Sequence, residues 1–145
     1  MNAFTVDLDI KAFKGKGAFR ALMKQQRTVV ESVHIEMRKL EAEVAALDLP
    51  ILLVTVSDSK VAPYVKQLRL RWRVRGRTSP ENFERMRAQF RHIAAPLHGY
   101  LEVCNTRVLE LNALEAIFRY ATAQTGTFIE HGTVKIVGRR AVHTG

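Results

Sequence analysis

The chain has 145 residues, the length of a single domain, and a chain of this size buries enough surface to fold without disulfides or metal. Its 47% of hydrophobic and 26% of charged residues are ordinary globular proportions, which exclude general disorder. The longest apolar run, 49–54, is too short to cross a membrane, and Asp7 and Asp9 interrupt the place of a secretory signal. A single cysteine, Cys104, excludes an internal disulfide, so we expect a cytoplasmic protein.

Positive charge is concentrated in one part of the chain. Lysine and arginine number 23 against 14 aspartate and glutamate residues, which gives a net charge of +9 and an isoelectric point near 10.2. Residues 51–80 hold 7 of the basic residues and 1 of the acids, so this fifth of the chain carries two thirds of the excess. Such a patch predicts an anionic partner and says nothing about the fold.

The first half of the chain predicts a strand, a long helix and a second strand. Apolar and polar residues alternate over 3–10, which is typical of a half-buried strand that ends at the glycines of 13–17. From 18 to 49 apolar residues recur every three or four positions, so we expect a helix of about 30 residues that the following proline terminates. The apolar, β-branched segment 51–56 predicts a buried strand.

A third strand and a helix start are predicted in the middle of the chain. Apolar residues alternate with charged ones over 65–75, which indicates a strand. Ser79, Pro80 and Glu81 are typical of a helix start. Serine can cap, proline needs no amide partner at the first position, and glutamate suits the positive end of the helix dipole.

A second long helix and a hairpin complete the predicted elements. Helical spacing continues to about residue 123, and Pro96 is expected to kink or split this stretch. Gly126 is expected to end the helix. The segments 127–130 and 133–137 then predict a small hairpin.

This order indicates an α+β protein in which two long helices cover one face of an antiparallel sheet. It is the β-α-β-β-α-β pattern of ferredoxin-like domains. A looser arrangement, two long helices packed antiparallel beside a hairpin, explains the pattern nearly as well. We expect a single domain over 1–138, followed by a basic flexible tail over 139–145.

Arginine occupies every odd position from 69 to 77, and apolar residues occupy the even positions from 68 to 74. Because alternate residues of a strand point to the same side, we expect the guanidinium groups to form one outward row, about 6.8 Å apart, with Trp72 in the core. Two nucleotides of a stacked single strand advance about the same distance, and guanidinium binds phosphate bidentately. The residues predicted to contact a nucleic-acid backbone are Lys66, Arg69, Arg71, Arg73, Arg75 and Arg77.

Further cations are expected to extend this surface. Arg87 and Arg91 lie one turn apart on the helix predicted to follow. Lys14 and Lys16 flank glycines just before a helix N-terminus, where free amides attract phosphate. The glycine spacing is not that of a P-loop, so an ordinary strand-to-helix turn is the favoured interpretation of this segment. We include all four in the predicted nucleic-acid-binding surface.

The alternating arginines have a second interpretation. On the wet face of a strand they can be solvated, paired with carboxylates across the sheet, or paired within an oligomer. The acids expected nearby are Asp7, Asp9 and Asp58, and three acids cannot neutralise six basic groups. We therefore favour an anionic partner, and the apolar stripes of the long helices allow a homodimer.

No catalytic, metal or cofactor site is predicted. The five histidines lack metal-ligand spacing, and one cysteine cannot build a zinc site. The segment 57–60 matches Ser-x-x-Lys without a companion motif. Asp58 and Lys60 resemble the end of a metal-dependent nuclease motif, for which Asp7 or Asp9 could supply another carboxylate. We expect a protein that is not an enzyme, with such a nuclease as the minor alternative.

Two short motifs, Phe-Lys-Gly-Lys-Gly at 13–17 and Leu-Arg-Trp-Arg at 70–73, resemble an uncharacterised protein family encoded on integrating conjugative elements and plasmids. The segment 107–112 is similar to a late helical segment of that family, so the resemblance covers about residues 13–120. It implies a mobile-element context and no activity, because the family has no established function. The predicted hairpin at the end of the chain departs from the family pattern.

Two functions remain open from the sequence. The first is a nucleic-acid-binding accessory protein of a mobile genetic element, with single strands favoured and little sequence preference, because phosphate contacts carry no sequence information. The second is a protein interaction module, such as an inhibitor of a host defence complex or a small subunit of a ribonucleoprotein. Neither requires a membrane.

Overall fold

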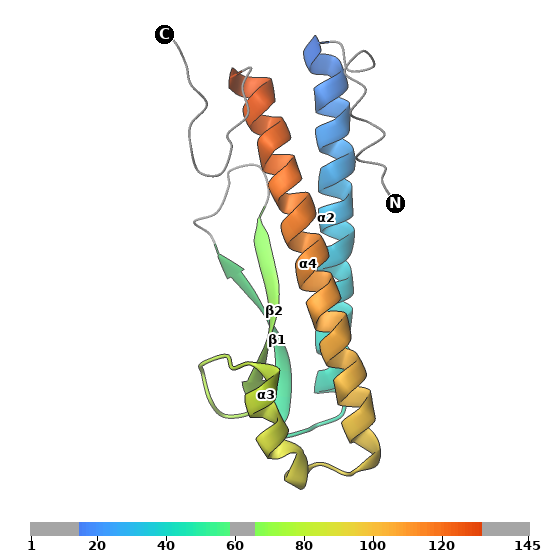
Figure 1. Cartoon of the computed structure of the whole chain (residues 1–145), viewed down its shortest axis with the longest axis vertical. Coiled ribbons are helices and arrows are strands. Elements are labelled where there is room, and N and C mark those ends of the chain that lie inside the picture. The colour runs from blue at the N-terminus through green and yellow to red at the C-terminus, as the bar shows by residue number, and fades with distance from the viewer. Residues whose placement is uncertain (1–14, 59–65, 132–145) are drawn as a thin grey trace.

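The structure is a computed structural model that describes residues 15–58 and 66–131 (Figure 1). The elements in chain order are the helix α2 (Gly15–Ala45), the strands β1 (Ile51–Asp58) and β2 (Gln67–Val74), the short helix α3 (Phe83–Met86), the 3₁₀ helix η2 (Arg87–His92) and the helix α4 (Pro96–His131). The two long helices run antiparallel side by side, and the strand pair packs beside them. The fold is therefore α+β, with a two-stranded antiparallel sheet covered on one face by two helices.

The two long helices pack through stripes that alternate steps of four and three residues. The buried stripe of α2 comprises Gln26, Val30, Val33, Met37, Leu40 and Val44, and that of α4 includes Leu101, Cys104, Val108, Leu111 and Glu115. Such spacing keeps one continuous seam between two helices. Near the sheet the seam is apolar and forms the core with the strands. Farther along it is polar, with Gln26, Thr122 and Thr125 buried between the helices.

The sheet buries alternate side chains against the helices. Ile51 and Leu53 of β1 are buried together with Leu68, Leu70 and Trp72 of β2. Trp72 is 3% exposed, and its ring lies 5.0 Å from that of Phe83, which confirms that it belongs to the core. Cys104 of α4 is also buried.

Helix side chains satisfy the backbone along the outer edges of the sheet. The Asn112 amide accepts from Leu70 N at 2.9 Å and donates to Leu70 O at 3.1 Å, as a neighbouring strand would. Glu115 accepts from Leu68 N at 3.0 Å, and on β1 Glu41 accepts from Thr55 N at 3.4 Å. Because unpaired edge groups invite pairing with other chains, these contacts both fix the sheet and protect it.

The ferredoxin-like order β-α-β-β-α-β does not match the order of the described elements. The described order is helix, strand, strand, helix, so the looser alternative of two antiparallel helices beside a strand pair fits it. The strand predicted over 3–10 lies outside the described residues. The first long helix begins at Gly15 and not at residue 18. The first four amides of a helix have no partner within the helix, so glycines in this first turn do not prevent the earlier start.

The predicted start of the second long helix is also wrong. Glu81 N donates to Trp72 O at 2.8 Å, which keeps Glu81 extended beside β2 and moves the start of α3 to Phe83. Asn82 replaces Ser79 as the cap and accepts from Arg85 N at 3.0 Å. Pro96 splits the helical stretch as expected, because α4 begins at this proline.

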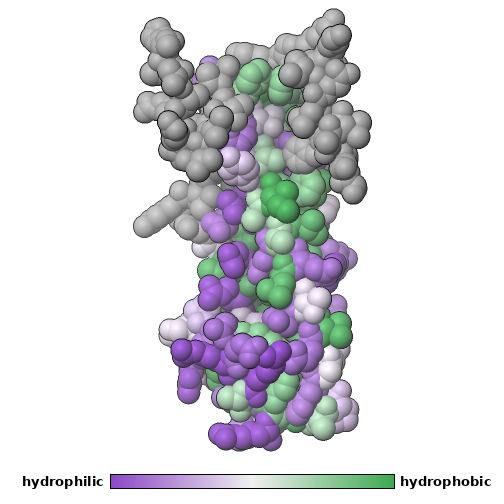
Figure 2. Space-filling model, in the orientation of Figure 1, coloured by the Kyte–Doolittle hydropathy of each residue, from purple (hydrophilic) through white to green (hydrophobic). Residues whose placement is uncertain are grey.

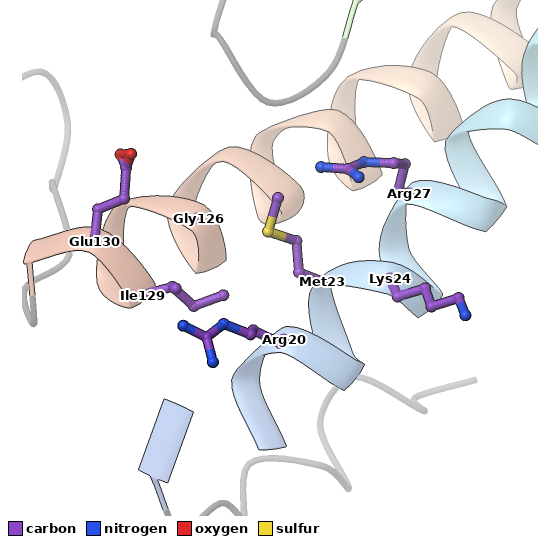
Figure 3. A pocket seen from close by; sticks show the side chains of 7 residues that line it. All are labelled: Arg20, Met23, Lys24, Arg27, Gly126, Ile129 and Glu130. Atoms are coloured by element: carbon purple, nitrogen blue, oxygen red, sulfur yellow. The ribbon is translucent and has the colours of Figure 1, made fainter. Parts of the chain in front are cut away.

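Gly126 does not end α4, which continues to His131. Figure 3 shows Gly126 in the middle of a helical turn, facing α2 near Met23 and Arg27. Gly126 is buried, and packing against α2 outweighs its low helix propensity. The predicted hairpin strand at 127–130 is therefore helical, and its partner at 133–137 lies outside the described residues.

Candidate nucleic-acid interface

Three arginines line the outer face of β2, away from the helices. The strand is extended over Gln67–Val74, and its buried positions are Leu68, Leu70 and Trp72. The intervening residues, Arg69, Arg71 and Arg73, therefore share the opposite face, and we call them the arginine row. Neighbours are about 6.8 Å apart and the row is about 14 Å long. The predicted strand geometry is confirmed here.

The neighbours of the arginine row on β1 are apolar. Arg69 lies opposite Val56, Arg71 opposite Val54 and Arg73 opposite Leu52. None of these side chains can neutralise a guanidinium group. Val56 is 41% exposed, so this half of the outer face is open to solvent.

No carboxylate within 15–58 and 66–131 forms an ion pair with the arginine row. The ion pairs of the neighbouring segments involve other arginines. The Nε atom of Arg73 is buried and has no acceptor within the same ranges. A buried donor without an acceptor is costly, but this atom has almost no solvent-accessible surface and does not itself bind an external phosphate.

Arg75 and Arg77 do not continue the row. Because β2 ends at Val74, the prediction of a strand through Arg75 is wrong by one residue. Arg75 Nε donates to Leu49 O at 2.9 Å, and its Nη2 lies 3.5 Å from Asp48. The chain then turns at Gly76, whose φ of 88° suits glycine. Arg77 Nη1 lies 3.6 Å from Glu81, so both side chains are engaged in local pairs.

Arg87, which was also predicted to contact nucleic acid, is paired with carboxylates. Arg87 donates to Glu102 at 2.9 Å, pairs with Glu84, and covers the Phe83 ring at 5.0 Å. The hydrogen bonds that Arg87 donates to these two carboxylates raise the pKa of Arg87, and the bond to Glu102 lowers the pKa of Glu102. Arg87 is thus a structural cation.

Two of the other predicted cations have no carboxylate partner among the residues that the structure describes. Lys66 is exposed directly before β2. Arg91 is exposed and donates to the His92 ring at 3.1 Å. Lys16 belongs to the first turn of α2, and Lys14 lies outside the described residues. The structure therefore places the arginine row on β2 and Lys66 directly before this strand, and it places the other described residues of the predicted set elsewhere.

A groove of about 470 Å³ runs along the edge of β2 that does not pair with β1, and it borders the arginine row. Arg69 and Arg71 line it from the strand, and Asn105, Leu109 and Asn112 line it from α4. Asn105 also accepts from Trp72 Nε1 at 2.9 Å. Sequence reasoning missed these helix residues, although Asn105 and Asn112 recur seven positions apart, which places them on one helix face.

The described residues contain no cluster of three or more histidine, cysteine, aspartate or glutamate side chains that could hold a metal ion. Asp58 is the last residue of β1, and Lys60 lies outside the described part of the chain, so the nuclease alternative stays a prediction. Within 15–58 and 66–131, none of the helices has the length and apolar character needed to cross a membrane.

No family model, curated protein or solved structure matches the chain. The resemblance to the family of integrating conjugative elements stays a prediction.

Proposed function

We propose that this chain is a non-enzymatic protein that binds the phosphate backbone of nucleic acid, with single strands favoured, through the arginine row. The observation that carries the proposal is the set of three guanidinium groups on one strand face, with apolar neighbours and no carboxylate partner among the described residues. Lys66 adds a fourth cation at the start of the strand.

The energetics of the row favour an anion without requiring one for folding. Two guanidinium groups 6.8 Å apart repel by about 0.6 kcal/mol in water. This cost is small enough for the folded chain to tolerate. A phosphate between two neighbours replaces the repulsion by two attractive contacts, each of which arginine can make bidentately.

Binding through this face is expected to be independent of sequence. Base stacking requires an aromatic platform, and the outer-face neighbours on β1 are Leu52, Val54 and Val56. Trp72 faces the core and cannot stack on a base. Contacts are therefore with phosphates, which carry no sequence information. The pitch of the row matches alternate phosphates of a stacked single strand.

We further propose that the chain serves as an accessory protein of a mobile genetic element. The support is the Leu-Arg-Trp-Arg motif at 70–73, which includes two members of the arginine row and the tryptophan that anchors the strand. The two arginines of the motif belong to the outer face of β2, and its leucine and tryptophan are buried in the core.

The test measures binding of labelled DNA and RNA oligonucleotides, single- and double-stranded, by fluorescence anisotropy. In the variant Arg71→Gln/Arg73→Gln, the loss of two single-strand contacts is expected to weaken binding roughly 60-fold at 50 mM salt, for all sequences alike. The control Lys24→Gln/Arg38→Gln removes the same charge from exposed positions of α2 and should change affinity by less than about threefold.

The proposal is overturned if the wild-type protein binds none of these oligonucleotides, or if both variants weaken binding equally. Absence of binding would favour the interaction-module alternative, in which the same basic face docks on an acidic protein or a nucleoprotein.

A further inference from the structure

Five large apolar side chains are exposed on the side of α4 that faces away from α2. Large apolar side chains are exposed there: Val103 by 68%, Leu109 by 62%, Leu114 by 41%, Ile117 by 57% and Tyr120 by 55%. We call these five residues the outer α4 face. Figure 2 shows hydrophobic surface along the front of the molecule, where α4 lies in the view of Figure 1. A helix that packs on one side normally carries charged and polar residues on the other.

The outer α4 face is not needed for the fold of the single chain. The residues of α4 that pack on α2 and the sheet, such as Leu101, Val108 and Leu111, lie on the opposite side of the helix. The apolar stripes from which the sequence predicted a possible homodimer are therefore buried in the contact between α2 and α4. Exposed apolar patches of this kind mark interaction sites in soluble proteins.

We infer that the outer α4 face binds a second copy of this chain, with the two α4 helices antiparallel. The first reason is charge. The protein carries a net charge of +9, so two copies repel over most of their surface, and contact between them is favoured only at a face without excess positive charge. Within 103–120 the charges of α4 are balanced by local pairs: Arg107 lies 3.8 Å from Glu110, and Arg119 lies 3.1 Å from Glu115. The absence of unpaired arginine between these pairs also disfavours an acidic partner or nucleic acid at this face.

The second reason is that the face is self-complementary. A two-fold axis near the middle of the stretch 103–120 sets Val103 of one copy beside Tyr120 of the other, and Leu109 beside Leu114. The exposed small residues Ala113 and Ala116 lie near this centre and allow the two backbones to approach closely. Antiparallel packing also opposes the two helix dipoles.

The size of the face fits a reversible dimer. The stretch 103–120 is about 26 Å long. Two such helices packed 8–10 Å apart bury roughly 1,000 Å² in total, close to the lower limit for a specific interface. We therefore expect a dissociation constant in the micromolar range, and a monomer at lower concentration.

The test is sedimentation velocity of the full chain, without nucleic acid, from roughly 2 to 200 μM. Its outcome is independent of the proposed nucleic-acid binding. The wild-type protein should shift from the 16.5 kDa monomer to twice that mass as concentration rises. Ile117→Glu should stay monomeric. Ile35→Glu is the matched control, because Ile35 is 55% exposed on α2, almost as much as Ile117, and should dimerise like the wild type.

A cysteine variant tests the same contact without adding charge. Ala113→Cys lies near the proposed two-fold axis and should form a disulfide-linked dimer on mild oxidation, while the buried Cys104 does not react. The inference is overturned by a wild-type protein that is monomeric throughout this range. It is equally overturned by a dimer that Ile117→Glu leaves intact, or by one that Ile35→Glu disrupts as strongly.

Discussion

Replacement of Glu115 measures how much one buried carboxylate contributes to holding β2 on the helix pair. Glu115 is 1% exposed and accepts from Leu68 N at 3.0 Å. Its carboxylate also accepts from Arg119 Nε at 3.1 Å and lies 3.6 Å from the His34 ring. The carboxylate thus joins both long helices to the strand that carries the arginine row.

The expected cost of Glu115→Ala follows from the groups that lose their partner. A buried backbone N–H left without an acceptor costs about 1–3 kcal/mol, and Leu68 N would be such a group. Arg119, whose side chain is 19% exposed, would also lose its carboxylate. Breaking a buried pair by removing one partner costs about 3–5 kcal/mol. These terms overlap, so we expect the free energy of unfolding to fall by about 3–5 kcal/mol.

The pH dependence provides a second signature of the same contact. Burial alone would raise the pKa of Glu115, but the nearby His34 ring and the hydrogen bonds from Leu68 N and Arg119 lower this pKa below its ordinary value of 4.5. Because the folded pKa is lowered, this stabilisation is present above pH 4.5 and is lost as the pH falls through the folded pKa. Glu115→Gln cannot titrate, so its free energy of unfolding should fall less than that of the wild type between pH 6 and pH 3.

Urea unfolding followed by circular dichroism measures both effects. The matched control is Glu110→Ala on the same helix, where the carboxylate is 59% exposed and lies 3.8 Å from Arg107. We expect this exposed pair to contribute less than about 1 kcal/mol. The reasoning would be refuted if Glu115→Ala cost no more than Glu110→Ala, or if Glu115→Gln kept the full pH dependence of the wild type.

Three further predictions concern single side chains. Asn112→Ala removes both partners of the Leu70 backbone, so urea unfolding should show a loss of about 2 kcal/mol; an unchanged midpoint would mean that the amide does not support the strand edge. Gln26→Leu should raise the thermal midpoint by several degrees, because the buried Gln26 Oε1 has no donor among the described residues, and a lower midpoint would contradict this reading. Burial raises the pKa of the Cys104 thiol, so Ellman's reagent should react with it only after denaturation, and rapid reaction with the folded protein would show that the seam is open.

The sequence predicted elements with strong periodicity well and their boundaries poorly. The alternation around Trp72 identified β2 and its inward face. A period of two is typical of a strand, and the apolar residues of the alternation must lie on the buried face. The spacing of apolar residues likewise identified both long helices. Gly126 and Pro80 misled the prediction, since a tertiary contact overrode a local preference at each: packing on α2 at Gly126, and the bond from Glu81 to Trp72 beside Pro80.

The sequence predicted which face of the strand carries the arginines, but it did not predict how many arginines belong to that face. Alternation alone indicated that Arg69, Arg71 and Arg73 share one face. Whether Arg75 and Arg77 join them depended on the strand end at Val74 and on partners distant in sequence, such as Asp48. The outer α4 face was hidden because α4 is apolar on both sides, and a sequence pattern does not say which side packs within the chain.

The most direct measurement of the central claim is the salt dependence of single-strand binding. With three or four phosphate contacts, from the arginine row and Lys66, the logarithm of the affinity should fall against the logarithm of salt concentration with a slope of about −2 to −3. In Arg71→Gln/Arg73→Gln the slope should be shallower by about 1.4, while Lys24→Gln/Arg38→Gln keeps the wild-type slope. Equal slopes in the wild type and the Arg71→Gln/Arg73→Gln variant would contradict the assignment of the phosphate contacts to β2.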